Sequence, residues 1–354
     1  MSENTHSHLW PGVPLALGAA ILFGASTPLS KYLLGSIDPW MLAGVLYFAA
    51  GSGLFAVRTI RKITKQETAE AALSAADYPW LAAVVIIGGM IGPLLLMFGL
   101  SRTGAGQASL LLNLEGLATM GIAWLVFREN VDRRLLIGAF AILSGAALLA
   151  WDGTRFSFDL GGLLIAGACL AWGIDNNLTR KLSSADPIQI AMIKGIAAGA
   201  ANLVLAFSLG ADAPSVGTAA AASVVGFFGI GVSLVMFMLG LRHLGTARTG
   251  AYFSLAPFVG AVLAIVLLRE SVTVQLVAAG MLMAIGLWLH LAERHEHEHV
   301  HGELEHDHRH VHDVHHNHVH EDEVIEPHSH WHRHTPMRHK HPHYPDLHHR
   351  HGHS

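Results

Sequence analysis

Hydrophobic residues gather into ten long runs along the chain, and shorter segments richer in polar and basic residues separate them. Each run has about the length of a transmembrane helix, which needs roughly 20 predominantly apolar residues. The runs cover residues 13–34, 40–57, 80–100, 107–127, 135–151, 160–178, 187–209, 218–239, 249–268 and 272–291. They lack the turn-punctuated strands and the polar helix faces of a soluble domain. The pattern predicts an all-α integral membrane protein.

Composition supports this prediction. Of the 354 residues, 52% are hydrophobic and 14% are charged, whereas soluble domains carry about 25% charged residues. Mean hydropathy is +0.42. So much apolar surface needs the lipid bilayer as its partner, and no strong footprint for nucleic acid is present. The single cysteine, Cys169, falls inside a run, so no intramolecular disulfide is available.

The basic residues of the loops predict the orientation. With a cytoplasmic N-terminus, eleven Lys and Arg lie on the cytoplasmic side and four on the other side, in line with the positive-inside rule. The eleven are Arg58, Arg61, Lys62, Lys65, Arg128, Arg133, Arg134, Arg180, Lys181, Arg242 and Arg248, and the four are Lys31, Arg102, Arg155 and Arg269. An even number of spans returns the C-terminus to the same side. We expect a multi-pass protein of the inner (plasma) membrane with both termini cytoplasmic.

Two blocks of sequence recur with the same offset. Residues 99–104 (GLSRTG) correspond to 240–245 (GLRHLG), and residues 127–131 (FRENV) correspond to 268–272 (LRESV). A third pair of segments, one before Lys31 and one before Arg180, corresponds at a slightly larger offset. The chain is therefore expected to consist of two similar halves. Each half has five spans, so the second must enter the membrane in the opposite orientation, as in transporters built from inverted repeats.

The same residues carry a resemblance to a known family. They are Leu22-Phe23-Gly24 with Lys31, Ala171-Trp172-Gly173 with Arg180-Lys181, and the Arg-Glu-x-Val corners at residues 128–131 and 269–272. On these motifs, the chain from about residue 15 to residue 291 resembles the EamA-type branch of the drug/metabolite transporter superfamily. The resemblance implies ten transmembrane helices in two inverted five-helix repeats, residues 13–151 and 160–291. It also implies cytoplasmic termini, a central cavity and, mostly, export of small metabolites or drugs.

Glu115 is the deepest ionisable residue of the predicted spans. It lies eight residues into its span, about 12 Å from the outer end at 1.5 Å per residue, and a charge at the bilayer centre costs about 2.5–3.5 kcal/mol. We interpret Glu115 as a proton-coupling or cation-binding carboxylate; the alternative is a buried acid paired with one helix neighbour. Asn113 lies roughly 200° away around the same helix. The second half has Ser254 and Ala256 at these two positions.

Further polar residues lie within or near the ends of other spans. Lys194 shares a helix face with Asn202, and its long stem leaves both a cavity role and snorkelling to the interface open. Residues 175–177 end the sixth span, where they line the cavity or cap the helix. The candidate substrate-binding or coupling residues are Glu115, Asn113, Asp175, Asn176, Asn177, Lys194 and Asn202. Lys31 and Arg180, at corresponding span ends, are expected to bind headgroups or helix carbonyls.

Residues 292–354 form a tail of different composition. All but four of the 27 histidines lie there, many in H-x-H alternation, and we expect disorder because few apolar residues are available for a core. Imidazole binds nickel, cobalt, copper and zinc, so the tail is a candidate divalent-metal binder without unique geometry, and no cofactor is required. The candidate ligands are His295, His297, His299, His301, His306, His308, His310 and His312. Residues 295–299 match H-E-x-x-H because the composition forces it, so no enzyme is expected.

Two transport functions fit these observations. We favour an exporter of a small metabolite or drug-like solute that works by alternating access. The alternative is an exporter of nickel, cobalt or zinc that uses the tail to capture the ion. This alternative is weaker because the spans contain no cluster of soft metal ligands. A metal-sensing membrane protein without transport is a third interpretation, and homodimer formation is left open.

Overall fold

The computed structural model describes residues 11–64, 73, 75–127, 133–151, 159–179, 182, 186–244, 246–291, 296–301, 304–310, 328–334 and 337–342. The chain divides into two compact units, Met1–Ala292 and Glu293–Ser354. The described residues of the first unit are almost entirely helical, and those of the second form strands. Each unit is described by itself.

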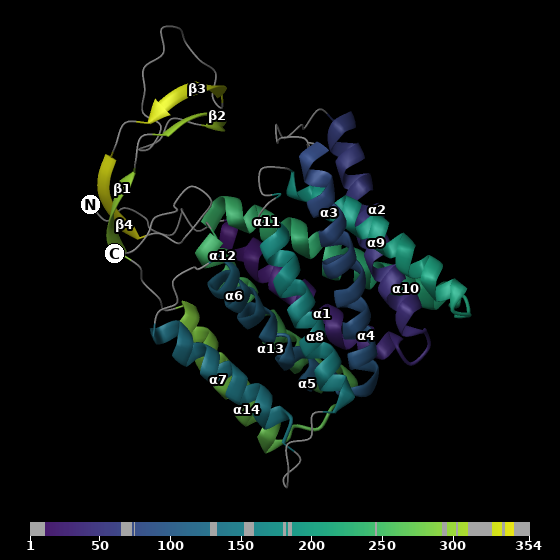
Figure 1. The fold of residues 1–354 in the computed structure, drawn as a ribbon. Helices are drawn as coiled ribbons and strands as arrows, with labels where there is room; N and C mark the ends of the chain where they lie inside the picture. The colour runs from purple at the N-terminus through teal and green to yellow at the C-terminus, as the bar shows by residue number, and fades with distance from the viewer. Residues whose placement is uncertain are drawn as a thin grey trace. The chain divides into compact units, whose positions relative to one another are not determined.

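The described residues of the first unit form ten successive helical rods (Figure 1). Six rods are single helices: α1 (Gly12–Leu33), α2 (Pro39–Ile63), α7 (Arg133–Leu149), α8 (Leu160–Thr179), α9 (Pro187–Ser208) and α14 (Val274–Leu291). Two composite rods contain a π-helix: α3 (Tyr78–Val84), η2 (Val85–Ile91) and α4 (Gly92–Arg102), and then α10 (Val216–Gly226), η4 (Phe227–Val232) and α11 (Ser233–Leu244). Two more consist of α5 (Ala105–Leu111) with α6 (Leu114–Phe127), and of α12 (Thr246–Phe253) with α13 (Ala256–Leu268). A 3-10 turn, η1 (Ala75–Asp77), precedes α3.

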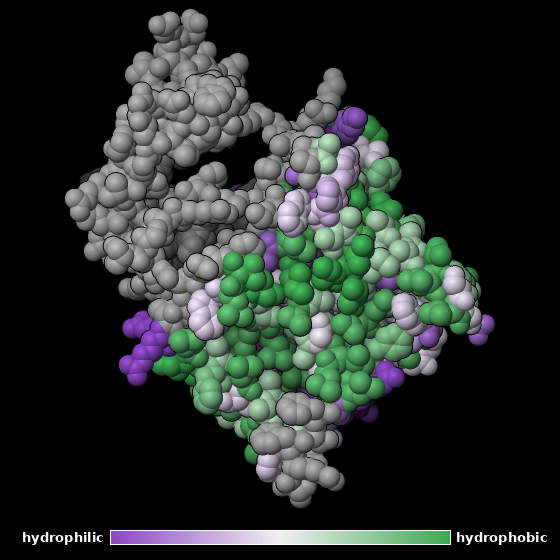
Figure 2. Space-filling view, in the orientation of Figure 1, coloured by the Kyte–Doolittle hydropathy of each residue, from purple (hydrophilic) through white to green (hydrophobic). Residues whose placement is uncertain are grey.

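Seven of the described rods are long and apolar enough to cross a membrane. They cover Gly12–Leu33, Pro39–Ile63, Tyr78–Arg102, Ala105–Val126, Ile188–Ser208, Val216–Gly240 and Thr249–Leu268. Large hydrophobic side chains are exposed on the rods, for example Leu125 and Phe140, each 73% exposed. Figure 2 shows hydrophobic residues over most of the coloured surface and the strongly hydrophilic ones near its margins. The prediction of a multi-pass helical membrane protein is confirmed, and each of the ten predicted spans overlaps one rod.

Two rods begin with the same local device in the two halves. Asp38 precedes Pro39 at the start of α2, and its carboxylate accepts hydrogen bonds from the backbone N–H groups of the first turn. Asp186 precedes Pro187 at the start of α9 and does the same. An acidic N-cap satisfies free amide groups, and proline is tolerated in the first turn because it lacks an N–H. The sequence therefore fixes where both helices start.

The α-helices of the composite rods are interrupted at corresponding positions in the two halves. The break between α5 and α6 at Leu112–Asn113 has its counterpart at Ser254–Leu255 between α12 and α13, and the π-helices η2 and η4 correspond in the same way. These positions follow the offset of the sequence repeat to within a single position. From the sequence, Pro93 and Pro257 each predict either a break in the helical hydrogen-bond ladder or a packing kink. Two of the four interruptions contain a proline: Pro93 and Pro257 stand in the first turns of α4 and α13, where their missing N–H groups end the preceding hydrogen-bond ladder. The matched interruptions, at η4 and between α5 and α6, contain none.

Each half packs its helices against helices of the other half, and the contacts correspond between the halves. α1 packs against α11 and α13, and α8 packs correspondingly against α4 and α6. α2 packs against α9, and α7 against α14, so these helices contact their own counterparts (Figure 1). In the α2–α9 pair, Gly44 lies against Leu203 and Gly51 lies against Ile196. Because one residue number rises as the other falls, the two helices run antiparallel.

Close glycine contacts repeat between the halves. Gly24 of α1 lies against Val259 of α13, and their counterparts, Gly173 of α8 and Ala118 of α6, lie against each other. Small residues at helix contacts let backbones approach closely within a membrane. Further matched contacts are Gly18 with Met236 and Gly167 with Leu95, and Gly145 with Met283 and Gly286 with Ile142.

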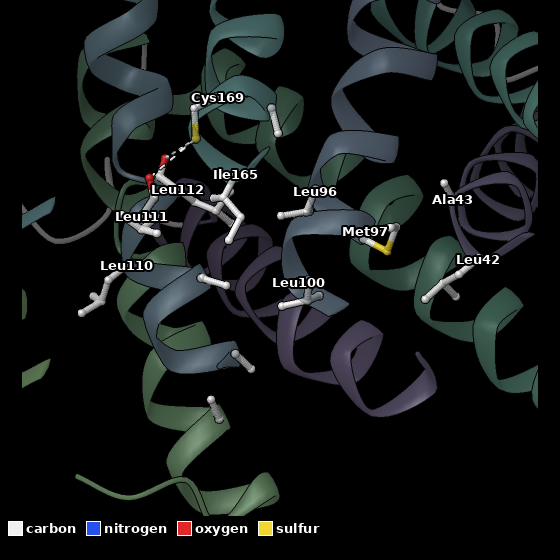
Figure 3. Packing of buried hydrophobic residues seen from close by; sticks show 14 of the residues in the cluster. Leu42, Ala43, Leu96, Met97, Leu100, Leu110, Leu111, Leu112, Ile165 and Cys169 are labelled. Carbon is white, nitrogen blue, oxygen red and sulfur yellow. Dashed lines mark hydrogen bonds between the residues drawn. The ribbon is translucent and has the colours of Figure 1, made fainter. Parts of the chain in front are cut away.

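Buried apolar residues form one large cluster around α2, α4, α5 and α8 (Figure 3). Cys169 is a free, buried cysteine within it. Its thiol lies 3.6 Å from the backbone oxygen of Leu111 and 4.0 Å from that of Leu112. These carbonyls lie at the break between α5 and α6, and the thiol is a weak donor to them. The Leu112 carbonyl also accepts from the backbone N–H of Glu115 at 3.1 Å. Cys169 therefore gives the carbonyl oxygens at the break an additional hydrogen-bond donor.

The second unit contains four strands within the tail. β1 (Glu296–His301) pairs antiparallel with β4 (Met337–Pro342), and β2 (Leu304–His310) pairs antiparallel with β3 (His328–His334). The structure has strands in these four segments, for which the composition predicted disorder. The H-x-H alternation has the two-residue period of a strand, and the prediction from composition did not use this period. His295 and His312 lie outside the described residues.

Candidate functional site

A buried ion pair joins α8 to α9 beside the π-helix η2. Lys194 Nζ donates to Asp175 Oδ2, and the two side chains are 19% and 7% exposed. The Asp175 carboxyl group occupies the space that a Cβ atom on Gly88 would need, and the stem of Lys194 lies beside Gly89. The two glycines of η2 therefore provide the room for the ion pair. Such π-helical turns occur frequently at functional sites.

The backbone of η2 is held by two aromatic side chains. The carbonyl oxygen of Gly88 accepts hydrogen bonds from Trp172 Nε1 at 3.0 Å and from Tyr47 Oη at 3.4 Å. A carbonyl released by a π-helical turn needs such donors, because water is absent from the bilayer core. Trp172 and Tyr47 thus fix the position of Gly88, and with it the space over Gly88 that the Asp175 carboxyl group occupies.

Glu115 and Asn176 form the second part of the cluster, between α6 and α8. Asn176 Nδ2 donates to Glu115 Oε1 at 3.1 Å and to Thr119 Oγ1 at 3.2 Å. The Thr119 hydroxyl in turn donates to the backbone oxygen of Glu115 at 2.9 Å. Glu115 is half-buried and Asn176 is exposed. The carboxylate therefore keeps accessible surface and is held by an amide rather than by a cation.

The last member of the polar triplet also reaches across to α6. Asn177 Nδ2 donates to the backbone oxygens of Thr119 at 3.1 Å and of Gly173 at 2.8 Å. Residues 175–177 lie inside α8, which continues to Thr179. The interpretation of these residues as a helix cap is therefore wrong, because α8 extends past them and the side chains of all three contact neighbouring helices. The alternative of a snorkelling Lys194 is also wrong, since its ammonium group is bound to Asp175.

Two of the candidate residues make no contact with this cluster through their described hydrogen bonds. Asn113 lies at the break between α5 and α6, where its Nδ2 donates to the backbone oxygen of Leu110 at 2.9 Å and lies 3.8 Å from the sulfur of Met283. Asn202 is fully buried, and neither atom of its amide has a hydrogen-bond partner in the described part of the chain. Asn113 therefore has a structural contact, and Asn202 is an unexplained buried amide.

The positions that correspond to the two acids in the other half are uncharged. Ser26, which corresponds to Asp175, lies over Gly229 as Asp175 lies over Gly88. Ala256 corresponds to Glu115. A side chain over a glycine of the π-helix therefore occurs in both halves, whereas the charged residues occur in only one half. Near α12 the side chains are aromatic instead: the Phe253 ring centroid lies 5.4 Å from that of Phe23 and 4.7 Å from that of Phe237.

Two charged residues bind helix ends away from the cluster. Lys31 Nζ donates to the backbone oxygen of Leu100 at 2.6 Å, so the expectation that it binds helix carbonyls is confirmed; Arg180 lies outside the described residues. The carboxylate of Glu270 accepts from the backbone N–H groups of Ala105 at 2.6 Å and Gly106 at 2.8 Å. An acid at a helix N-terminus is favoured by the helix dipole. Glu270 therefore ties the corner after α13 to the start of α5.

Sequence reasoning missed several residues of the site. Thr119 stands one turn after Glu115, and this i, i+4 spacing on a polar helix face was a usable signal. The Gly88-Gly89 doublet inside an apolar run was another, because such glycines mark close approach. The role of Tyr47 had no signal in the sequence. In the part of the chain described with side chains, no three His, Cys, Asp or Glu residues gather to hold a metal ion, so the metal-exporter alternative gains no support there.

Comparison with known proteins agrees with the arrangement of ten rods in two sets. The sequence profile of the EamA-like transporter family matches residues 10–151 and 159–292. The chain belongs to the EamA-like transporter family. The two matched segments of this EamA-like transporter coincide with the two halves inferred from the internal repeat. The prediction of an EamA-type transporter is thereby confirmed.

Two proteins described as transporters are similar to this EamA-like transporter. An uncharacterized transporter of Methanothermobacter thermautotrophicus is 30% identical over 296 residues, which cover 79% of this chain and 86% of the relative. The uncharacterized transporter YyaM of Bacillus subtilis is 23% identical over 257 residues, covering 69% of this chain and 82% of the relative. A crystal structure of another protein shares the fold with a TM-score of 0.59 and 17% identity, over 79% of this chain and 95% of that one.

Proposed function

We propose that the protein exports a small metabolite or drug-like solute by alternating access between two inverted halves, which together form ten membrane-spanning helices. The exchange of packing partners carries this proposal: α1 reaches across to α11 and α13 as α8 reaches across to α4 and α6. The corresponding helices α2 and α9 run antiparallel, as inverted halves require. An arrangement in which each half packs on the other can rock between two equivalent states around the site at their interface.

The orientation proposed for the chain puts both termini in the cytoplasm, as the eleven basic residues on that side against four on the other favour. α5 and α13 then meet on the outer side, where Ser109 lies against Gly260. On the cytoplasmic side of the two helix breaks, Gly116 and Gly250 have no described atom within 4 Å of the position that a Cβ atom would take. This conformation is consistent with a pathway closed outside and open toward the cytoplasm.

A flux measurement on purified protein tests the proposal without knowledge of the solute. Proteoliposomes loaded with a small-molecule cell extract are diluted into empty buffer, and mass spectrometry identifies the solutes that leave. We expect one or a few small solutes to leave vesicles that contain the wild type faster than they leave protein-free vesicles. Glu115→Gln should slow the same solutes, because Glu115 is the accessible carboxylate of the cluster. Identical release from all three preparations, with and without a pH gradient, would refute the proposal.

We also propose that the His-rich tail binds divalent nickel, cobalt or zinc separately from the transport pathway. The strand register supports this, because it pairs histidine with histidine at five positions. In β2 and β3, the paired histidines are His306 with His332, His308 with His330 and His310 with His328. In β1 and β4, they are His297 with His341 and His299 with His339. Histidines at neighbouring register positions provide the nitrogen ligands that these metals prefer.

A further inference from the structure

We propose that Glu115 binds the ammonium group of a cationic amine solute and gives up its proton as the amine binds. The inference rests on the proposed transport function and names its substrate class. Three features of the described cluster support it: the balance of charges, the hydrogen-bonding capacity around Glu115, and the open space along α6.

With Glu115 ionised, the charges of the cluster do not balance without an added cation. Asp175 and Lys194 neutralise each other within their ion pair. An ionised Glu115 would then leave one net negative charge inside the helical unit, and a carboxylate at the bilayer centre costs about 2.5–3.5 kcal/mol on insertion scales. One proton removes this charge, and one ammonium group removes it equally well. An anionic solute would add a second negative charge and is therefore disfavoured.

The hydrogen-bonding groups around Glu115 suit an ammonium ion. Asn176 Nδ2 is bound to Glu115 Oε1 and Thr119 Oγ1, so the second carboxylate oxygen and further lone pairs remain to accept bonds. An ammonium group has three donors and no acceptor. The carboxylate of Glu115 and the hydroxyl oxygen of Thr119 thus provide acceptors close together, because both contact the same amide group.

Space for a solute lies next to these groups. Gly116 follows Glu115 on α6, and no described atom lies within 4 Å of the position that a Cβ atom would take there. Asn176 is exposed and Glu115 is half-buried. The carboxylate of Glu115 is therefore not fully enclosed by side chains, and it lies next to the unfilled position at Gly116.

The other titratable groups near Glu115 are already bound. Lys194 on α9 is paired with Asp175 on α8, and Tyr47 on α2 donates to a backbone oxygen at 3.4 Å. The Cys169 thiol on α8 lies 3.6 Å from a backbone oxygen. α7, which also packs against α6, has no titratable residue after its first two arginines. Competition between a proton and an amine is therefore expected at Glu115 itself.

Three ligands of similar size and different charge test this inference. Benzylamine is a cation at neutral pH, benzyl alcohol is neutral, and benzoate is an anion. Their binding to the purified full-length chain is measured by calorimetry, and proton release is measured in weakly buffered solution. We expect benzylamine to bind most tightly and to release up to one proton for each amine bound. Glu115→Gln should weaken benzylamine binding at least about tenfold, as the loss of a charged hydrogen bond implies, and should abolish proton release.

Two further variants keep the test sharp. Glu115→Asp keeps the charge and should retain proton release, and Asp159→Asn, which changes a carboxylate at the start of α8, should behave as the wild type. Equal binding of the three ligands, or benzylamine binding and proton release that Glu115→Gln leaves unchanged, would overturn the assignment of an amine site. Neither result would affect solute release from the proteoliposomes, whose failure would instead refute the transport function.

Discussion

Replacing Lys194 with methionine removes one charge of the buried ion pair and keeps a side chain of similar length beside Gly89. Asp175 is 7% exposed, so its carboxylate would lose its cation with almost no access to solvent. Removing one partner of a buried ion pair costs about 3–5 kcal/mol. At about 1.4 kcal/mol for each factor of ten, the equilibrium constant for unfolding should rise 100-fold or more. Asp175→Asn should destabilise the protein to a similar degree, because it leaves Lys194 unpaired.

The double variant separates the ion pair from the rest of the packing. In Asp175→Asn with Lys194→Met no unpaired charge remains, and replacing a whole buried pair is often neutral. We therefore expect the double variant to lie within about 1 kcal/mol of the wild type, with a large favourable coupling between the two changes. Ser26→Ala is the matched control, because Ser26 occupies the corresponding seat over Gly229 and donates to its own helix at 2.6 Å. It should cost about 1 kcal/mol or less.

Reversible unfolding in mixed micelles, with a denaturing detergent as titrant, measures these differences. The expected order of stability is wild type, Ser26→Ala and the double variant close together, with both single variants far below. Free energies of the single variants that simply add in the double variant would refute the reasoning, because the two charges would then be independent. A double variant no more stable than Lys194→Met would also refute the coupling between the two charges.

Three further changes test other parts of the structure. Gly88→Ala places a methyl group where the Asp175 carboxyl group lies and should cost about 1–3 kcal/mol of unfolding free energy. Gly116→Ala, which meets no described atom, should be neutral or stabilising. Equal effects of the two changes would contradict the position assigned to the Asp175 carboxyl group over Gly88. Glu270→Gln should cost about 0.3–2 kcal/mol and speed hydrogen exchange of the amides at residues 105–106, and unchanged exchange would remove Glu270 from the helix end. Truncation after Glu293 should abolish most binding of nickel or zinc while leaving the melting temperature of the helical unit unchanged, and equal metal content with and without the tail would contradict a metal site there.

The repeat could be recognised in the sequence because the repeated motifs are separated by a constant number of residues. Residues 99–104 and 240–245 keep one offset, and the structure repeats that offset closely in its π-helices and helix breaks. The interruptions without a proline, at η4 and between α5 and α6, were not predicted, because hydropathy averages over a span and does not detect where one carbonyl loses its partner. Pro93 and Pro257 indicated an interruption, but its position depended on contacts with other helices.

The site was predictable only in part. Glu115 and Asp175 were identified because charges are costly in a membrane, but their different partners depend on which helices are adjacent. Lys194 lies 19 residues after Asp175 in sequence, on another helix, and nothing in the local pattern specified that the two would meet. Asn113 was included because it is close to Glu115 in sequence, and the helix break turns it toward Leu110 instead. Helix faces can be read from sequence, whereas helix pairing requires the fold.

Accessibility of a single cysteine at position 116 tests the central claim most directly. In a Cys169→Ala background, Gly116→Cys puts a thiol where the structure has open space beside Glu115. A membrane-impermeant maleimide is added to intact cells and, separately, to everted vesicles. Alternating access predicts labelling from both faces, faster from the cytoplasmic face because the described conformation is closed where Ser109 meets Gly260. Labelling from one face only, or from neither, would contradict a site that opens alternately to the two sides.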